Sequence, residues 1–465
     1  MEVSTPGIQR QNIAARIDRL PLSREIWSIL FLAGLSWLLE SYDIGIIGTV
    51  LPTITKQFHL DTFTVGWLAT ASTLGIVVAI LPAGWLTDRI GRKHMLALGT
   101  AWYAFFSLLC AFTPNIPLLL LLRFVAGFGM GAIFPIPYAM AAEFTPGHKR
   151  GLMTGILDSF LSVGYFAAPL LGFLANSWFT SGQSWRFLFL LGGLPLLYVP
   201  ALLKWMPESP RWLQIRGRNS EADGIVHHLE TSIEQRLQKP LPMPRSSVLA
   251  SSEESASPLA FLRRPYLKRT LMMWVSFACI LFIFYAIQTY TPTVLVKQGY
   301  GLDNAFLYTS FIVIASIPGK YAVAYALERW GRKKTLIVFT LIAAVSAIGF
   351  GFSHTVLLSL AFGALMSFFG IGVDPGIKIY GAEQYPTSIR ALGISGFECV
   401  GRLFGGALAP FIMAFIIAGG GIAGSYIFLA TVALVGVLAV AFLGHETRGK
   451  TLEQAVIIED ERRIA

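Results

Sequence analysis

The sequence contains twelve apolar segments that are each long enough to cross a lipid bilayer, for which a helix needs about 20 residues. Only 13% of the 465 residues are charged, whereas 54% are hydrophobic. Since about a quarter of the residues of a soluble domain are charged, a water-soluble protein is excluded. We therefore predict an all-α integral membrane protein with twelve transmembrane helices. The expected spans are residues 27–51, 64–86, 94–113, 116–138, 152–176, 186–206, 268–294, 306–327, 335–354, 356–381, 391–418 and 422–444.

The distribution of basic residues predicts how these helices are oriented. Most of the 36 lysines and arginines fall in the two tails and in alternate loops, while the other side holds only Lys56, Arg186 and Lys297. By the positive-inside rule, both termini are expected to be cytoplasmic. The net charge of +10 then reflects topology, and we expect no nucleic-acid partner. The first span lacks the short apolar region and small-residue cleavage site of a signal peptide, so we expect it to be retained.

A long polar stretch divides the chain into two similar halves. When the sequence is shifted by 240 residues, Asp88 falls on Glu328 and Arg150 falls on Arg390. Such parallel repeats predict two pseudo-symmetric six-helix bundles with a substrate path between them. In the polar stretch, short amphipathic helices are expected, for example around residues 221–237. The predicted domains are a tail at 1–26, a bundle at 27–206, a linker at 207–267, a bundle at 268–444 and a tail at 445–465.

Five motifs carry a family resemblance. They are the loop segment Gly84–Lys93, its second copy Ala324–Lys333, and the segments Arg123–Gly131, Glu143–Gly151 and Pro207–Leu213. Together they resemble the major facilitator superfamily. The last two are similar to the branch that holds sugar porters, organic cation and anion transporters, synaptic-vesicle-glycoprotein-2-like proteins and bacterial niacin and metabolite:proton symporters. The resemblance implies the major facilitator fold, transport by alternating access, a monomer, and a bacterial inner (plasma) membrane location.

The charges of the two loop motifs are interpreted as gating residues. Gly84 would let two helices approach closely, Asp88 would face a helix N-terminus, and Arg89 and Arg92 would pair with carboxylates such as Glu143. In the resembling family such charges act as a cytoplasmic latch on the outward-open state; the alternative is topology signals and solvated salt bridges. The expected gating residues are Gly84, Asp88, Arg89, Arg92, Glu143, Arg150, Glu328, Arg329, Arg332, Glu383 and Arg390.

Ionisable residues inside the spans are costly in hydrocarbon and are candidates for function. Asp43 on the first helix and Arg123 on the fourth lie at similar depths and could form an ion pair facing the cavity. Protonation of Asp43 would release Arg123 and bias the conformational equilibrium. The pair resembles the proton-coupling Asp and Arg of bacterial sugar porters, and Glu40 could share or relay the proton. A static pair that fixes helix packing is the alternative.

The expected cavity lining departs from that of sugar porters. Where the resemblance places sugar-binding amides and a tryptophan, this chain has Asp158, Cys279, Ile280, Tyr285 and Lys378. A neutral sugar would leave the two buried charges poorly paired, whereas a substrate with its own carboxylate would satisfy them.

Arg402 on the eleventh helix suits bidentate contact with a carboxylate. The alternative is that Glu398 with Arg402, and Asp374 with Lys378, neutralise each other as i, i+4 pairs. Asp158 could accept a ring N–H or carry a second proton, and Lys320 is expected to be snorkelling or paired. Aromatic side chains, including Phe284 and Tyr165, would sandwich a flat ring. The expected substrate-binding residues are Arg402, Lys378, Asp158, Tyr42, Tyr285, Gln288, Tyr290 and Glu398.

These observations predict a proton-coupled importer of a small organic acid, such as nicotinate or another aromatic carboxylate. Its partners would be the organic substrate, the proton and the lipid bilayer. The alternatives are a sugar or organic-cation symporter, or a transport-silent receptor on the same fold. No group of His, Cys and acidic residues has metal-ligand spacing, and no catalytic motif is present. We therefore expect no metal, no cofactor and no enzymatic activity.

Overall fold

The computed structural model describes residues 13–146, 149–179, 182–244, 260–263, 266–385 and 389–448. These residues form helices and connecting turns, with no β-strand among them. The prediction of a twelve-helix all-α fold is confirmed. The first six membrane helices are α3 (Arg24–Phe58), α4 (Thr62–Ile90), α5 (Arg92–Cys110), α6 with α7 (Ile116–Ile133 and Ile136–Phe144), α8 (Arg150–Trp178) and α9 with α10 (Ser184–Gly192 and Pro195–Trp205).

The second six follow the same plan. They are α13 (Leu267–Lys297), α14 with α15 (Leu302–Ile314 and Ser316–Trp330), α16 (Arg332–Gly351), α17 with α18 (Val356–Met366 and Asp374–Glu383), α19 with α20 (Arg390–Gly401 and Leu408–Gly419) and α21 (Gly421–Leu443).

Eleven of these helices are long and apolar enough to cross a membrane by length and composition. The twelfth is α5, which begins with Arg92, Lys93 and His94 and is 19 residues long. Because α5 is short, these three polar residues of its first turn lower the mean hydropathy of the whole helix. The remaining residues of α5 are apolar or small, and α5 packs along α6, α9 and α10 within the bundle, which identifies it as the third span.

Several membrane helices are interrupted near their middle, where proline and glycine are frequent. The fourth helix breaks at Pro135, because proline has no N–H to donate and its ring clashes with the preceding turn. The tenth and eleventh helices each contain a π-helical turn, Ser367–Ile371 and Arg402–Ala407. Such turns add one residue to the helical repeat and are frequent at functional sites. They re-aim the side chains that follow.

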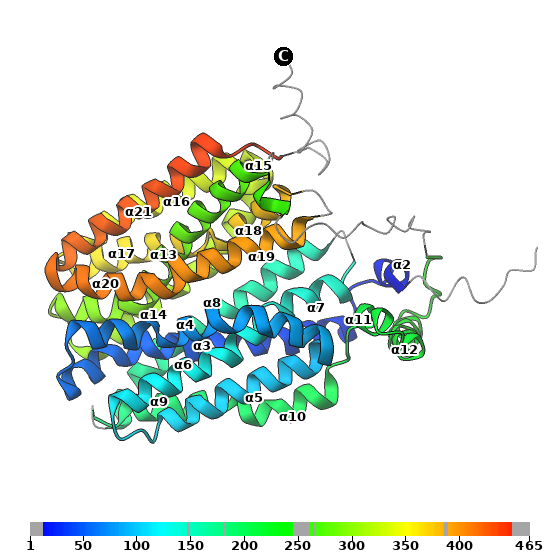
Figure 1. The fold of residues 1–465 in the computed structure, drawn as a ribbon, viewed down its shortest axis with the longest axis horizontal. Coiled ribbons are helices and arrows are strands. Elements are labelled where there is room, and N and C mark those ends of the chain that lie inside the picture. The colour runs from blue at the N-terminus through cyan, green and yellow to red at the C-terminus, as the bar shows by residue number, and fades with distance from the viewer. Residues whose placement is uncertain are drawn as a thin grey trace, which may run out of the picture.

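Three further helices lie together beyond one end of the membrane helices (Figure 1). They are α2 (Ile13–Asp18), α11 (Pro210–Ile215) and α12 (Asn219–Leu237), and α12 coincides with the amphipathic helix expected in the linker. The buried side chains of Ile13, Ile17, Trp212, Leu213, Ala222 and Val226 form a small apolar core that joins them. We call this end of the molecule the α12 end, and the other the opposite end.

The two groups of six helices pack side by side along their length (Figure 1). Helix α3 packs on α13, α4 on α20, and α8 on both α14 and α15. Small residues permit the closest approach. A side chain on Gly48 would collide with the backbone of Gln288 and Thr289, and one on Gly172 would collide with Thr49 and crowd Phe306. Because lipid tails are as apolar as the side chains, the hydrophobic effect does not drive membrane helices together. Close packing of this kind holds them together instead.

Candidate functional site

The space between the two bundles is closed at the opposite end and open as a cavity toward the α12 end. At the opposite end, Thr70 donates to the Ala407 carbonyl at 2.8 Å, and Asn176 donates to Asp303. Toward the α12 end lies a cavity of about 330 Å³, within the range of small-molecule sites. Its lining comes from both bundles and consists of Tyr138, Thr154, Gly155, Lys320, Ala324, Pro375, Lys378, Ile379, Ala382, Ile394 and Glu398.

A buried ion pair crosses from one bundle to the other at the wall of this cavity. Lys320 Nζ lies 2.6 Å from Asp158 Oδ2 and donates to the Asp158 carbonyl at 2.7 Å. The other carboxylate oxygen accepts a 2.7 Å hydrogen bond from the Tyr138 hydroxyl. Asp158 and Lys320 are both almost fully buried, so desolvation makes each dependent on the other. The expected pairing of Lys320 is present, and Asp158 is its partner.

The second bundle supplies two further ion pairs around the same cavity. Lys378 Nζ lies 2.6 Å from Asp374 Oδ2 and 3.4 Å from the Tyr138 hydroxyl. Arg402 Nε lies 3.3 Å from Glu398 Oε2. These are the i, i+4 pairs that the sequence left as an alternative to substrate binding. In this conformation, therefore, each cation is neutralised by its own helix.

Phe134 and Tyr138 connect the N-terminal bundle to these cations. The Arg402 guanidinium lies 3.5 Å from the centroid of the Phe134 ring, and Lys378 Nζ lies 5.7 Å from the same centroid. Cation–π contacts of this kind strengthen when the cation is desolvated. Sequence reasoning missed both aromatic residues. A signal was available, because the break at Pro135 places them at the irregular centre of the fourth helix.

The expected aromatic slot is only partly formed. Tyr165 and Phe284, from different bundles, have ring centroids 5.2 Å apart, and Phe284 contacts Tyr285 at the same distance. Gln288 is buried, and its Oε1 has no hydrogen-bond partner within the described chain. These residues lie at the interface of α3, α8 and α13, where a planar ligand could replace aromatic contacts.

Two of the expected substrate ligands point elsewhere. The Tyr42 hydroxyl donates to the Leu188 carbonyl at 3.0 Å, within the N-terminal bundle. The Tyr290 hydroxyl donates to the Pro410 carbonyl at 2.6 Å and lies toward the opposite end. In this conformation neither hydroxyl is directed to the cavity, and the substrate role of Tyr42 and Tyr290 stays a prediction. Helix period alone did not reveal that both hydroxyls reach backbone carbonyls of neighbouring helices.

Asp43 and Arg123 form the ion pair that their depths suggested, but it does not face the cavity. Arg123 Nη1 lies 2.7 Å from Asp43 Oδ2, and Nη2 donates to the Asp43 carbonyl at 3.1 Å. The Ser107 hydroxyl donates to Asp43 Oδ1, and the Phe189 ring covers the guanidinium. Both charged side chains are fully buried among α3, α5, α6 and α9. The pair thus lies inside the N-terminal bundle, because α5 supplies the hydroxyl that completes it.

Glu40 lies one turn before Asp43 and has no such partners. Its side chain is buried, and neither carboxylate oxygen has a hydrogen-bond partner among the described residues. The charge of Arg402, on the other bundle, acts on it through space. Glu40 is therefore a buried carboxylate of the first helix that has no hydrogen-bond partner among the described residues.

The gating residues of the N-terminal bundle interact within that bundle. Arg92 lies 3.2 Å from Asp88 and 3.9 Å from Glu143. Arg89 instead stacks on Trp85, 3.6 Å from the ring centroid, so its expected carboxylate pairing is wrong. Gly84 is also not a packing glycine here, because an added Cβ would meet no described atom within 4 Å. The side chain of Arg150 lies outside the described part of the chain.

The second copy of the loop is arranged in the same way. Arg332 lies 3.1 Å from both Glu328 and Glu383, while Arg329 donates to the Tyr325 hydroxyl at 2.9 Å. Arg390 Nε lies 3.5 Å from the Tyr385 carbonyl. Among the described residues, no ion pair joins the gating loops of one bundle to those of the other. The charges lie at the α12 end, where Trp212 of α11 donates to the Asp88 carbonyl.

Two glutamates that the sequence did not single out complete these loops. Glu208 Oε1 accepts hydrogen bonds from the backbone N–H groups of Arg92 and Lys93, at 2.8 and 3.2 Å. Glu446 accepts the equivalent bonds from Arg332 and Lys333, at 2.8 and 3.1 Å. A carboxylate at a helix N-terminus is stabilised by the free N–H groups and the helix dipole. The role expected for Asp88 is thus filled by Glu208, whereas the Asp88 carboxylate is largely exposed.

Comparisons with known proteins agree with this architecture. Residues 29–457 match the family described as sugar (and other) transporters. The sequence is 34% identical to the niacin transporter NiaP of Acinetobacter baylyi, over 95% of this chain and 99% of that protein. It is 29% identical to the 4-hydroxybenzoate transporter PcaK of Pseudomonas aeruginosa, over 88% of this chain and 90% of that protein. The fold matches the xylose transporter XylE of E. coli with a TM-score of 0.74, at 19% identity, over 92% of this chain and all of that one.

Proposed function

Because this chain belongs to the family of sugar (and other) transporters, we propose that it is a proton-coupled symporter that imports a small organic acid by alternating access. The family and the relatives are transporters, so the chain is a multi-pass membrane transporter and not an enzyme. The substrate class proposed is an aromatic carboxylate of the size of nicotinate. Transport of niacin and of 4-hydroxybenzoate by relatives supports this class.

The arrangement of cations around the cavity is the observation that carries the proposal. Lys320 and Lys378 line it, and Arg402 stacks on Phe134 beside it. Each is paired with a carboxylate of the protein, so an incoming substrate carboxylate would displace that acid from the cation, and a proton would neutralise the displaced acid. A sugar has no group that makes this exchange. We assign Arg402 and Lys378 as carboxylate ligands, with Glu398 and Asp374 as the acids that the substrate would displace from them. Asp158 is assigned as the acid that Lys320 holds at the same cavity, and Tyr285 and Gln288 as ring contacts.

Buried carboxylates on the first helix support the coupling to protons. Asp43 is held by Arg123 and Ser107, while Glu40 is buried and unpaired within the described chain. An unpaired buried charge is costly, which makes Glu40 a natural proton carrier. The charge of Arg402 acts on Glu40 through space. The binding of a proton to Glu40 and the binding of a substrate carboxylate to Arg402 would therefore favour each other. This interaction would link the two cargoes.

We further propose that the α12 end faces the cytoplasm, as the positive-inside rule predicts, and that the membrane is the bacterial inner membrane. The structure is then an inward-facing state. The absence of a described ion pair between the gating loops of the two bundles agrees with a latch that closes only in the outward-open state. The division into two bundles at residues 27–206 and 268–444, joined by the linker at 207–267, is the proposed domain arrangement, with a monomer as the working unit.

Uptake into proteoliposomes under an inward proton gradient tests the function. Radiolabelled nicotinate, benzoate, xylose and choline are compared side by side. We expect accumulation of the two acids and none of the sugar or the cation. Accumulation of choline would favour an organic-cation symporter, accumulation of xylose a sugar porter, and no accumulation of any compound a transport-silent receptor.

A further inference from the structure

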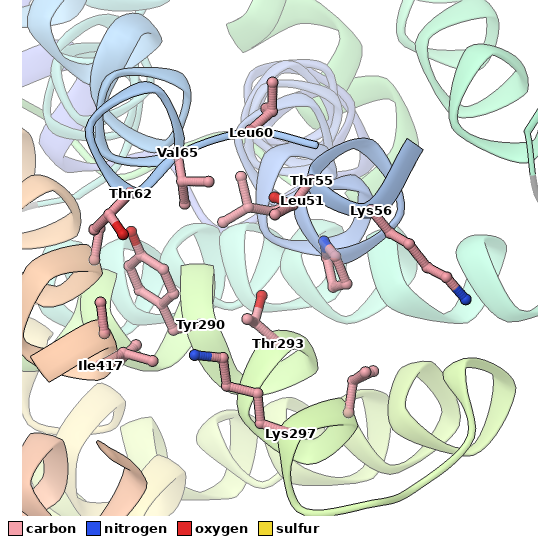
Figure 2. Close-up of a pocket in the computed structure, with 14 residues that line it drawn as sticks. Leu51, Thr55, Lys56, Leu60, Thr62, Val65, Tyr290, Thr293, Lys297 and Ile417 are labelled. Atoms are coloured by element: carbon pink, nitrogen blue, oxygen red, sulfur yellow. The ribbon is translucent and has the colours of Figure 1, made fainter. Parts of the chain in front are cut away.

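A second pocket, at the opposite end of the molecule, plays no part in the proposed central site. It has a volume of about 350 Å³ and lies where α3, α4, α13 and α20 meet, so its walls come from both bundles (Figure 2). Most of its lining is apolar and includes Leu51, Val65 and Ile417. The backbone contact of Gly48 with Gln288 and Thr289 separates it from the central cavity.

The polar groups of this pocket are all suited to an anion. Lys56 and Lys297 stand at its rim, in the last turns of the pseudo-equivalent helices α3 and α13. Both are exposed, and neither has an ion-pair partner among the described residues. In Figure 2, Lys297 extends back beneath Tyr290, while Lys56, on the opposite wall, extends away from Tyr290. Thr293 adds a buried hydroxyl that has no hydrogen-bond partner in the described chain.

No acidic side chain is among the 14 residues that line the pocket. Asp61, which lies between the lining residues Leu60 and Thr62 in sequence, accepts the backbone N–H of Thr64 as a helix cap. Basic residues are scarce at the opposite end by the positive-inside rule. Two of the three basic residues that the sequence places at this end, Lys56 and Lys297, line this one pocket. The third, Arg186, donates to the Ala111 carbonyl and stacks on Trp185.

We propose that this pocket is an outer capture site for the substrate anion, occupied before the bundles open. The ammonium groups of Lys56 and Lys297 bind the carboxylate, the Thr293 hydroxyl donates to it, and the apolar wall holds the ring. Because the walls belong to different bundles, the rocking motion that separates Gly48 from Thr289 would open the pocket into the central cavity. This inference rests on the proposed function for the chemical class of the ligand, a small organic monoanion.

The test is the uptake kinetics of labelled benzoate by the full-length protein in vesicles, measured from the side of the pocket at several ionic strengths. For Lys56→Gln/Lys297→Gln we expect a fall of about tenfold in kcat/KM at low salt, since cationic clefts raise anion association rates by at least this factor. The dependence on salt should become flatter. The internal concentration that half-saturates efflux should not change, because the central site is intact.

Matched variants separate a site from a general charge effect. Lys56→Arg/Lys297→Arg should keep wild-type kinetics, and Arg186→Gln, which removes one charge at the same end but outside the pocket, should have no effect. An equal effect of Arg186→Gln would overturn the proposal. Anionic lipid headgroups share the chemistry of the ligand, so vesicles with and without phosphatidylglycerol are compared. If the lysine effect occurs only with phosphatidylglycerol, the pocket binds lipid and the capture site is wrong.

The failure of this inference differs from the failure of the proposed function. If the wild type accumulates benzoate but the double glutamine variant keeps its kcat/KM and salt dependence, only the capture site is overturned. If the wild type transports no carboxylate, the proposed function is overturned and the capture site with it. Thermal unfolding of both double variants should match the wild type, because the lysines are exposed and make no ion pair within the described chain.

Discussion

Asp158 and Lys320 join the two bundles through a buried ion pair, with Lys320 Nζ 2.6 Å from Asp158 Oδ2. They lie 162 residues apart in sequence. Any motion that separates α8 from α15 at this level must break the pair or supply other partners. The Tyr138 hydroxyl, which donates to the other Asp158 oxygen, is such a partner and also lies 3.4 Å from Lys378 Nζ. Asp158 therefore keeps the Tyr138 hydroxyl as a partner when the pair breaks, whereas Lys320 must find a new one.

This pairing predicts a strong energetic coupling. Asp158→Ala and Lys320→Ala should each destabilise the protein by about 3 kcal/mol, because each leaves one buried charge unpaired. The double variant should cost clearly less than the sum of the two. The measurement is a double-mutant cycle on the unfolding free energy in detergent, with Tyr138→Phe as a control that removes only a neutral donor. Additive effects would show that the two charges are solvated independently.

Asp43 should be required for coupling but not for movement of substrate. Asp43→Asn keeps the side-chain shape and removes the titratable carboxylate that Arg123 and Ser107 hold. We expect loss of proton-driven accumulation, with exchange of labelled for unlabelled substrate retained. Both are measured in the same proteoliposomes. Loss of exchange as well would mean that the ion pair serves helix packing.

Arg402 should discriminate acids from their amides. Arg402→Ala removes the guanidinium that stacks on Phe134, and a charged hydrogen bond contributes about 2 kcal/mol. Nicotinate should therefore bind roughly 30-fold more weakly, while nicotinamide changes little. Competition binding with both ligands measures this, and Arg402→Lys should retain part of the affinity. Equal weakening of acid and amide would remove Arg402 from the ligand set.

The caps on the loop helices should contribute to stability. Glu208→Ala exposes two N–H groups at the start of α5 and should cost about 1 kcal/mol. Gly91→Ala should cost more, because Gly91 has φ = 98° and its Cβ would collide with the Glu208 carboxylate. Glu221→Ala is the control, since Glu221 forms an exposed pair with Arg218 that is worth little. Thermal unfolding ranks the three variants. An effect of Glu221→Ala as large as that of Glu208→Ala would contradict the capping role.

Acid should loosen α2 from α12. Burial alone would raise the pKa of Glu230, but hydrogen bonds from Arg16 and Arg19 lower it below the ordinary value of 4.5. A lowered folded-state pKa contributes stability that is present above the unfolded value and is lost as the pH falls through the folded value. Hydrogen exchange of the α2 amides should therefore rise below about pH 4.5. Glu230→Gln should exchange rapidly already at neutral pH, and a wild type that stays protected in acid would refute the role of this cluster.

Much of the architecture could be predicted because lipid imposes strong rules on sequence. The length of the apolar runs predicts the twelve spans, and the 240-residue shift predicts the repeat. The rise of a helix per residue places Asp43 and Arg123 at similar depths, where they can pair. The partners of individual charges could not be predicted in the same way. Asp158 was expected to bind substrate, yet its carboxylate is occupied by Lys320 and Tyr138. Tyr42 and Arg89 were placed on the correct helices, but their side chains turn to a carbonyl and a ring.

The sequence by itself determined that the chain crosses a membrane in two homologous sets of helices, since hydrophobic length, loop charge and internal repetition are properties of the chain read in order. Only the tertiary structure decided which charges meet across the bundle interface and which end of that interface is closed. The reason is that helix breaks at Pro135 and at the π-helical turns rotate the side chains beyond them. A buried ion can then be satisfied by whichever neighbour the packing brings within reach.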